Sequence, residues 1–280
     1  LQKYIDKDFM ISLKRNNKGD FVQASGLRTR KNTIYQANQA EIFRISRSKF
    51  NDFLNCPKCF YLDRVKGLKA PDMPGWTLNS TVDELLKKEF DKSRAEQKPH
   101  RILQRYGLEH IIPYQHPELD IWRDSFKGIE CQIFDTNLYL FGGIDDIWLN
   151  TVTNELIVLD YKSQADKYPV TTERYLNGIY HQGYKIQLEI YAYILKKMGF
   201  AVSNIGYFYV CNASKSMDGF HGSLLFEETL VPYKIQLDWI EGKLEEMLQT
   251  LNSENIPKSH FACQNCAFNQ EQMRIEQEYQ

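Results

Sequence analysis

Hydrophobic and polar residues alternate most regularly between Tyr139 and Gln164, where the chain reads YLFGGIDDIWLNTVTNELIVLDYKSQ. A period of two is typical of β-strands, so this stretch predicts two strands joined by a polar turn at residues 150–154. The first strand places one set of residues on one face: Tyr139, Phe141, Gly143, Asp145 and Ile147. The second strand does the same with another set: Leu156, Val158, Asp160 and Lys162. Residues 156–159 are all apolar, so both faces of the second strand carry hydrophobic side chains, and we expect this strand to be buried on both sides.

The rest of the chain mixes helix-like spacing with further strand-like runs. Apolar residues three or four apart predict a helix beginning near Ser46 and helices over residues 80–96, 185–198 and 233–251. A shorter helix is expected within residues 117–127. The apolar runs 205–211 and 223–231 predict two more strands. This order of elements indicates an α/β protein.

The composition is that of a soluble globular protein, since 42% of the 280 residues are hydrophobic and 25% are charged. No apolar run approaches the ~20 residues that span a bilayer, so we expect no membrane partner. The N-terminus lacks the apolar stretch of a secretory signal, which makes the cytoplasm the expected location. The chain begins with Leu rather than Met, as it would if an upstream piece were missing.

The overall formal charge of −1 conceals an uneven distribution along the chain. Residues 1–50 carry eleven Lys or Arg against four acids, and residues 51–280 carry a net charge of −8. We interpret residues 1–44 as a basic N-terminal extension, which could follow a phosphate backbone or remain a solvated appendage. The acidic remainder does not exclude a DNA substrate, because bound metal ions offset charge at a catalytic site.

Charged side chains stand near the ends of the two central strands. Asp145 and Asp160 come from adjacent strands and could share one divalent ion. Carboxylate oxygens suit Mg²⁺ or Mn²⁺, and such ions acidify water and stabilise charge on a phosphate. Lys162 shares a face with Asp160 and could orient the water. The acid-x-Lys pattern also occurs at residues 96–98 and 241–243, but in helix-like surroundings where residues two apart do not face each other.

Two motifs in this region resemble the core of the PD-(D/E)XK nuclease superfamily: Gly142-Gly143-Ile144-Asp145 and Leu159-Asp160-Tyr161-Lys162-Ser163. Gln187-Leu188-Glu189-Ile190-Tyr191 is similar to the Gln-x-x-x-Tyr motif of its RecB-like branch, which includes CRISPR-adaptation exonucleases and helicase-linked nucleases. The resemblance covers residues 45–270 and leaves 271–280 as a polar tail. It implies a restriction-endonuclease-like core, with a central mixed β-sheet flanked by helices.

The resemblance also implies roles for individual residues. Asp145 and Asp160 would bind Mg²⁺ or Mn²⁺, with the backbone carbonyl of Tyr161 as a third ligand. Lys162 would act in catalysis, and two further side chains would touch DNA or orient this lysine. The catalytic set is therefore expected to be Asp145, Asp160, Lys162, Gln187 and Tyr191.

One expected metal ligand of the family is replaced. Many members have a Gly-x-x-x-His pattern near the start of the preceding helix, and the matching positions here are Asn79 and Asp83. Asp83 could still provide an oxygen ligand. Residues 80–83 equally resemble a capping box, in which Asp83 would bond the backbone and favour the positive end of the helix.

Two Cys-x-x-Cys pairs, Cys56–Cys59 and Cys263–Cys266, lie at opposite ends of the nuclease-like segment. Two such pairs are typical of a four-thiolate metal site. RecB-like relatives bind a 4Fe–4S cluster through one cysteine before the core and three after it, but here the third C-terminal cysteine is absent and Cys59 would have to restore the count. Spacing therefore leaves Zn²⁺, a rearranged iron–sulfur cluster and free thiols open, although we favour a bound structural metal. The remaining cysteines are expected in the core: Cys131 and Cys211.

The polar connection over residues 166–184 is rich in tyrosine, and its length predicts a loop across the mouth of the site. Four of its side chains could meet the substrate: Lys167, Arg174, Tyr180 and His181.

These patterns predict a metal-dependent deoxyribonuclease that acts on single- or double-stranded DNA in repair, recombination or defence. The alternative is a catalytically weak or inactive nucleic-acid-binding or assembly module of the same fold, which the missing histidine and the irregular cysteines would suit. The sequence has no helicase motif, so a helicase or other repair or defence partner would be a separate protein.

Overall fold

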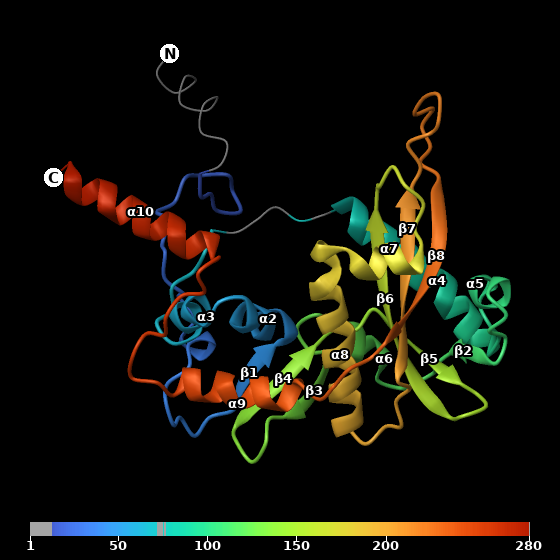
Figure 1. Ribbon diagram of the computed structural model, residues 1–280, viewed down its shortest axis with the longest axis horizontal. Coiled ribbons are helices and arrows are strands. Elements are labelled where there is room, and N and C mark those ends of the chain that lie inside the picture. The colour runs from blue at the N-terminus through green and yellow to red at the C-terminus, as the bar shows by residue number, and fades with distance from the viewer. Residues whose placement is uncertain (1–12, 72–74, 76, 280) are drawn as a thin grey trace.

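The computed structural model describes residues 13–71, 75 and 77–279, and in this part of the chain helices surround two β-sheets (Figure 1). The larger sheet is mixed, with the strand order β2-β5-β6-β7-β8. β6 and β7 are parallel, and the other neighbouring pairs are antiparallel. The strands have the following bounds: β2 (Ile111–Pro113), β5 (Asp146–Asn150), β6 (Glu155–Gln164), β7 (Ile205–Ala213) and β8 (Phe226–Lys234).

β5 and β6 form the predicted antiparallel hairpin. Asn154 closes its turn with a φ of 56°, a left-handed conformation that asparagine tolerates better than most residues. The residues from Leu156 to Leu159 are all buried, so the apolar run is covered on both faces, as predicted.

The first predicted strand is wrong in one respect, because it forms two strands that belong to different sheets. β4 (Leu138–Gly142) ends before the acidic pair, and β5 begins at Asp146. Between them, the Ile144 N–H donates to the carbonyl of Trp122 at 3.0 Å. The chain therefore leaves the sheet of β4 before it joins the sheet of β5. A Cβ at Gly143 would lie 3.0 Å from the backbone of a neighbouring loop, which makes this crossing tight for any larger residue.

The smaller sheet has the strand order β1-β4-β3, with β1 (Phe43–Ser46) parallel and β3 (Ile129–Gln132) antiparallel to β4. Part of β1 lies in the segment predicted as a separate extension. Tyr35 and Phe43 are each 3% exposed and belong to the main core. The core therefore begins upstream of residue 44, through isolated aromatic residues that the polar sequence around them does not reveal.

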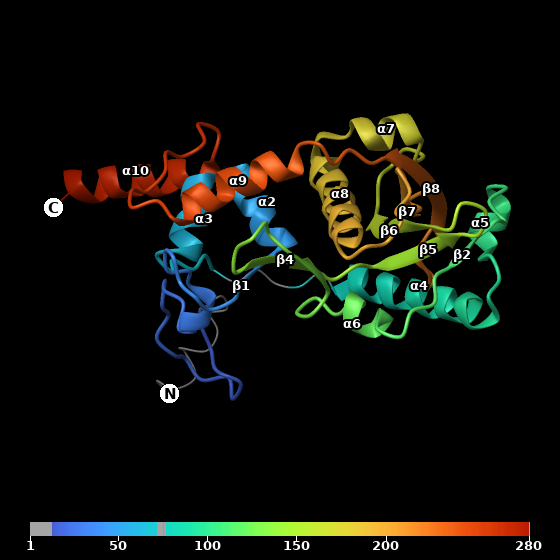
Figure 2. The ribbon, with the colours of Figure 1, turned by 90° about the horizontal axis from the view of Figure 1, so that it is seen from below.

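Two long helices cover opposite faces of the five-stranded sheet: α4 (Thr77–Glu96) and α8 (Gln182–Lys197) (Figure 2). Phe90 of α4 packs in one buried cluster with Trp148 and Tyr209. Leu188 of α8 packs in the other cluster with Val158 and further sheet residues. The prediction of a mixed sheet flanked by helices is therefore confirmed. Shorter helices complete this part: α5 (Arg101–Arg105), α6 (Leu119–Arg123), α7 (Thr172–Asn177) and the 3₁₀ turn η2 (Ile179–His181).

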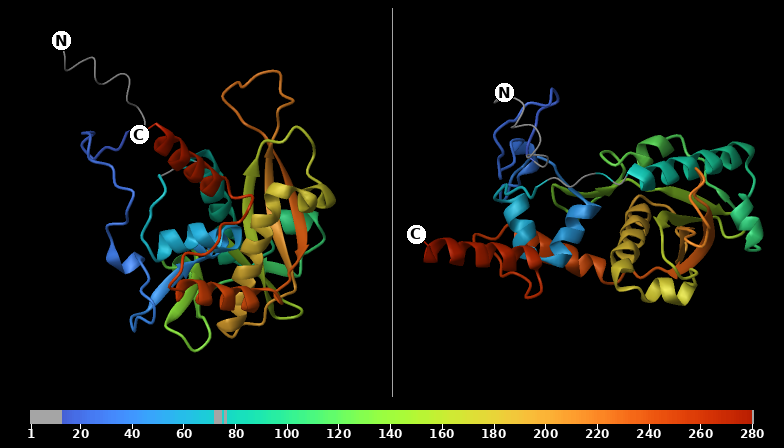
Figure 3. Two further views of the ribbon diagram at one scale, coloured as in Figure 1. Left: turned by 60° about the vertical axis from the view of Figure 1, so that its left-hand side comes forward. Right: turned by 90° about the horizontal axis from the view of Figure 1, so that it is seen from above.

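The remaining helices gather at the other end of the molecule, away from the five-stranded sheet (Figure 3). They have the following bounds: η1 (Lys31–Thr33), α2 (Arg47–Asn55), α3 (Pro57–Arg64), α9 (Ile240–Leu251) and α10 (Gln264–Glu278). α9 packs on α2 and α3. α10 projects from this group and has no buried residue.

Element boundaries differ from the predictions near the C-terminus. The helix predicted over residues 233–251 starts only at Ile240, because β8 continues to Lys234 and pairs there with Ile205. The predicted boundary at residue 270 falls inside α10. The turn sequence Asn16-Asn17-Lys18-Gly19 predicts a hairpin over residues 9–23. Arg15 and Phe21 form an antiparallel bridge on either side of this turn, and residues 9–12 lie outside the described ranges. No helix within those ranges is long and apolar enough to cross a membrane.

Candidate active site

Asp145 and Asp160 come together where β5 meets β6. Asp145 directly precedes β5, and its Oδ2 accepts a hydrogen bond from the Tyr161 N–H at 2.9 Å. Asp160 lies in β6 and is 0% exposed. Burial raises the pKa of the Asp160 carboxyl; Lys162 opposes this effect, and the adjacent Asp145 adds to it. The two carboxylates therefore lie at one site, with the partly exposed Asp145 nearer to solvent.

Lys162 places its ammonium group at the same point. Its Nζ forms an ion pair with Asp160 and donates to the Tyr161 carbonyl at 3.3 Å. Nζ also lies 4.7 Å from the centre of the Tyr184 ring. Burial alone would lower the pKa of Lys162, but Asp160 and Asp145 outweigh it and raise that pKa. Lys162 is therefore held as a cation by the two carboxylates.

α8 contributes the two residues of the Gln-x-x-x-Tyr motif. Gln187 Nε2 donates to Asp160 Oδ1 at 2.8 Å and lies 3.4 Å from the Tyr191 hydroxyl. Tyr191 is 2% exposed, so it lies behind Gln187 rather than at the surface. A Cβ at Gly142 would come within 2.7 Å of the Tyr191 ring. The glycine at the end of β4 therefore provides the space in which this tyrosine packs.

Arg47, the first residue of α2, also reaches this site, and sequence reasoning missed it. Burial raises the pKa of Tyr191, while the charge of Arg47 and its hydrogen bond lower it. Arg47 Nε is buried without a hydrogen-bond partner among the described atoms. Its only signal in the sequence is its position directly after Ser46, whose side chain caps α2 by accepting from Lys49 N.

Asp83 of α4 lies near the carboxylates but does not join them closely. Burial raises its pKa, and Asp145 adds to the increase. Its Oδ2 forms an ion pair with Lys87 at 2.8 Å. The capping interpretation is wrong, because α4 begins at Thr77 and Asp83 lies in its second turn.

The neighbouring Asp146 has a structural role, which its sequence position did not predict. It is fully buried, and its Oδ2 accepts from the Tyr161 hydroxyl at 2.8 Å. Its Oδ1 pairs with Arg94 of α4 and, at 3.0 Å, with Arg123 of α6. Asp146 thus fastens two helices to the sheet behind the site. The adjacent acids Asp145 and Asp146 were the available signal.

The donors at this site fit a hard divalent cation. The buried Asp160 Oδ2 accepts no hydrogen bond in the described part of the chain, although the ammonium of Lys162 lies against it. Asp145 and the Tyr161 carbonyl add oxygen donors, the type that Mg²⁺ and Mn²⁺ prefer. Asp83 does not come within 4.8 Å of both other carboxylates, since only the four cysteines form such a group among the described residues.

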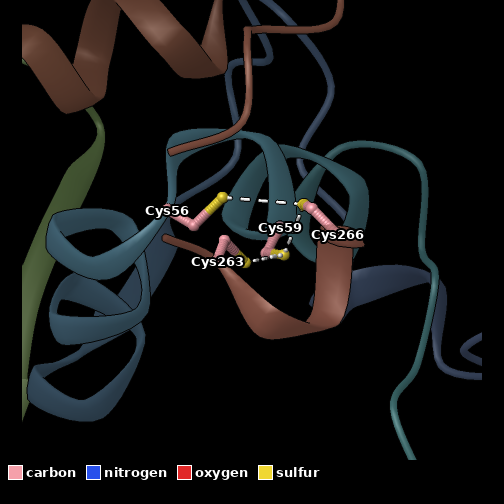
Figure 4. Close-up of side chains that lie close together, drawn as sticks. All are labelled: Cys56, Cys59, Cys263 and Cys266. Carbon is pink, nitrogen blue, oxygen red and sulfur yellow. Dashed lines mark hydrogen bonds between the residues drawn. The ribbon is translucent and has the colours of Figure 1, made fainter. Parts of the chain in front are cut away.

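The four cysteines of the two Cys-x-x-Cys pairs meet at a second place, between the start of α3 and the start of α10 (Figure 4). Their Sγ atoms all lie within 4.8 Å of one another. Cys56 and Cys59 lie 3.8 and 3.4 Å from Cys266, and Cys59 lies 3.6 Å from Cys263. The structure therefore brings together the residues that the sequence predicted as one site.

The thiol of Cys56 has an unusual protonation equilibrium. Burial would raise its pKa, but hydrogen bonds from the backbone of Cys59 and His260 outweigh burial and lower it to about 7. Thiolates are the form that binds metal ions. Cys131 and Cys211 are buried elsewhere in the core, and burial raises the pKa of each to about 12. Their prediction as core residues is confirmed.

The connection over residues 166–184 contains α7 and η2 and is therefore more ordered than the predicted loop. Arg174, Tyr180 and His181 line one cavity beside the end of β6, and Lys167 lines an adjoining one.

Comparison with known proteins gives the same family as the motifs. A search of curated proteins finds no match. A crystal structure from Eubacterium rectale, of a protein provisionally named an exonuclease, is 14% identical with a TM-score of 0.40, over 81% of this chain and 88% of that one. The sequence profile of the PD-(D/E)XK nuclease superfamily matches residues 75–270, which include both strands of the carboxylate site and helix α8. The chain that brings Asp145, Asp160 and Lys162 together thus belongs to the PD-(D/E)XK nuclease superfamily.

Proposed function

We propose that the protein is a metal-dependent DNA nuclease that hydrolyses phosphodiester bonds. The observation that carries this proposal is the convergence of Asp145, Asp160 and Lys162 at the meeting point of β5 and β6. Two carboxylates beside an ammonium group suit the binding of a divalent cation together with a phosphate.

Asp145, Asp160 and the Tyr161 carbonyl would hold Mg²⁺ or Mn²⁺, and Asp83 would assist from further out. When bound, such an ion supplies Lewis acidity, which neutralises phosphate charge and acidifies water. Lys162 is already held as a cation, so it would donate hydrogen bonds to the attacking water or to a phosphate oxygen. Gln187 fixes the orientation of Asp160 through its hydrogen bond.

Within the superfamily we propose the RecB-like branch. This assignment is supported by the contacts of Gln187 with Asp160 and with Tyr191, which place both residues of the Gln-x-x-x-Tyr motif at the carboxylate site. A helicase or other repair or defence partner would be a separate protein.

A cleavage assay on single-stranded DNA, double-stranded DNA and RNA, in Mg²⁺ and in Mn²⁺, tests the proposal. We expect wild-type cleavage of DNA and its loss in Asp160→Ala and Lys162→Ala. Lys243→Ala is the matched control, because Glu241-Gly242-Lys243 repeats the acid-x-Lys pattern on the exposed surface of α9. DNA binding without cleavage in every metal would instead identify an inactive binding or assembly module.

We further propose that the four cysteines hold one structural metal ion, most simply Zn²⁺. With Zn–S bonds of about 2.3 Å, the edge of a tetrahedron is about 3.8 Å. The contacts of 3.4, 3.6 and 3.8 Å fit this edge. In a 4Fe–4S cluster each cysteine binds a different iron, which requires more widely separated sulfur atoms. Elemental analysis should therefore find zinc without acid-labile sulfide, and stoichiometric sulfide would favour the cluster.

A further inference from the structure

A cavity of about 420 Å³ lies beside the C-terminal end of β6, between the segment that follows this strand and helix α7. Its volume is in the range of pockets that bind small organic groups, ~300–1,000 Å³. None of the proposed catalytic residues lines it. The cavity is therefore a separate concave feature next to the carboxylate site.

Two stacked aromatic rings lie between Lys162 and the cavity. The Tyr184 ring lies 4.7 Å from Lys162 Nζ and stacks on His181 with ring centres 5.4 Å apart. His181 lines the cavity and contacts the ring of Tyr175, another lining residue. Tyr175 is buried, and its hydroxyl has no hydrogen-bond partner among the described residues. A group bound in the cavity would thus lie two aromatic rings away from Lys162.

Tyr180 lines this cavity, and its ring is exposed to solvent. It is 86% exposed, and it stacks on no other ring in the described part of the chain. Tyr168 differs, because Arg174 lies 4.2 Å and Lys167 lies 4.7 Å from the centre of its ring. Tyr180 is therefore the lining residue that can offer an aromatic face to a ligand.

The charges around the cavity favour an anionic ligand. Arg174 lines it and is oriented by Asp166 at 3.0 Å. Lys167 and Lys215 line the adjoining hollow, which shares Asp166 with the cavity. Three cations and one carboxylate therefore line the cavity and the adjoining hollow together, a balance suited to a phosphate backbone.

We propose that this cavity binds one unpaired nucleobase of the substrate strand, stacked on Tyr180, with a neighbouring phosphate near Arg174. The inference rests on the proposed nuclease function and specifies its substrate as a strand with unpaired nucleotides. A base inside a duplex is covered on both faces by its neighbours and offers none to Tyr180, whereas an unpaired base stacks readily on an aromatic ring. The side-chain amides of Gln164 and Asn177, which also line the cavity, can hydrogen-bond the edge of the base.

Binding measured without cleavage tests this subsite. The probe is a fluorescently labelled short oligothymidylate, titrated with the full chain without added Mg²⁺ or Mn²⁺ and followed by anisotropy, beside a blunt duplex of equal length. We expect tighter binding to the single strand and a loss of roughly tenfold in Tyr180→Ala, the size expected for one lost base–aromatic stack. Tyr180→Phe should bind as wild type. Tyr279→Ala is the matched control, because Tyr279 is also 86% exposed but lies at the end of α10.

Arg174→Gln should weaken binding and reduce the salt dependence of the affinity by about one charge. Equal affinities of Tyr180→Ala and Tyr279→Ala, or a wild-type preference for the duplex, would overturn the subsite. DNA cleavage together with an unaffected Tyr180→Ala would reject the subsite and leave the nuclease standing. A protein that cleaves nothing, yet loses single-strand binding in Tyr180→Ala, would support the subsite and reject the hydrolytic function.

Discussion

The carboxylate site and the cysteine cluster both gather potential metal ligands, but the chain assembles them in opposite ways. Asp145 and its hydrogen-bond donor Tyr161 are 16 residues apart, within one hairpin. Cys59 and Cys263 are 204 residues apart and connect helices at the two ends of the chain. The first site is set by strand register inside a packed sheet. The second joins two segments distant in sequence, one of which continues into α10, a helix without a buried residue.

This difference separates two uses of a metal ion. At the carboxylate site the protein already holds the donors in place through Gln187, Lys162 and the Tyr161 N–H. An ion at this site would contribute to catalysis and would add little to the stability of the fold. At the cysteine cluster an ion would act as a cross-link that closes a long loop, which reduces the entropy of the unfolded chain.

The largest contrast should appear between adjacent aspartates. Asp145→Ala should lower DNA cleavage by roughly a thousandfold, because a proposed metal ligand is lost, and should change stability by less than about 1 kcal/mol. Asp146→Ala removes the fully buried partner of Arg94 and Arg123, which keep the half-exposed Asp91, and should destabilise by about 3–5 kcal/mol. Steady-state kinetics and urea unfolding measure the two effects. Similar destabilisation by both substitutions would make the carboxylate site structural.

A second contrast compares two buried or half-buried cysteines. Cys59→Ala should lose the bound metal and about 2–4 kcal/mol of stability, the range for a cross-link that closes a long loop. Limited proteolysis should then cut within α10. Cys211→Ala, which removes a core thiol outside the cluster, should keep the metal and the protease resistance. Unchanged proteolysis of Cys59→Ala would show that α10 is held by other means.

A third effect should be smaller and confined to the active site. Gln187→Ala removes the hydrogen bond that orients Asp160 and should cost about 10–100-fold in activity or metal affinity. The Mn²⁺ concentration for half-maximal cleavage should rise. Gln182→Ala, an exposed position on the same helix, is the control. If both variants behave as wild type, Gln187 does not position the aspartate.

The smallest effect concerns acid stability on the α4 side of the sheet. His100 Nδ1 accepts from Ile102 N–H at 3.3 Å, and Nε2 donates to Glu89 at 3.0 Å, so the ring is held neutral. Burial lowers the pKa of His100 below 6.5, its value in the unfolded chain. The unfolded state therefore binds the proton first, and stability present above pH 6.5 is lost as the pH falls.

For a single proton this loss is at most about 1.4 kcal/mol per pH unit. Urea unfolding of wild type and His100→Gln between pH 7 and 5 measures it, and the difference between the two proteins should shrink toward low pH. A difference that stays constant with pH would mean that His100 does not resist protonation.

Local patterns predicted the central hairpin, because a strand period of two depends only on neighbouring residues. β6 and α8 lie where the sequence placed them, and Asp145, Asp160, Lys162 and Gln187 meet. The same periodicity failed across Gly143, because β4 and β5 have the same alternation but different partner strands. Helical spacing also misplaced the start of the helix predicted over residues 233–251, because the first two of these residues pair with β7.

The sequence by itself determined the central hairpin and which residues are candidates for the chemistry, since their type and spacing within one hairpin and one helix are local properties. Only the tertiary structure decided that Asp160 is sealed beneath Gln187 and that Asp146 fastens α4 and α6. It alone brought thiols from both ends of the chain within 4.8 Å and left a cavity beside Tyr180. These features arise from packing between segments distant in sequence, and no period within a single segment encodes such contacts.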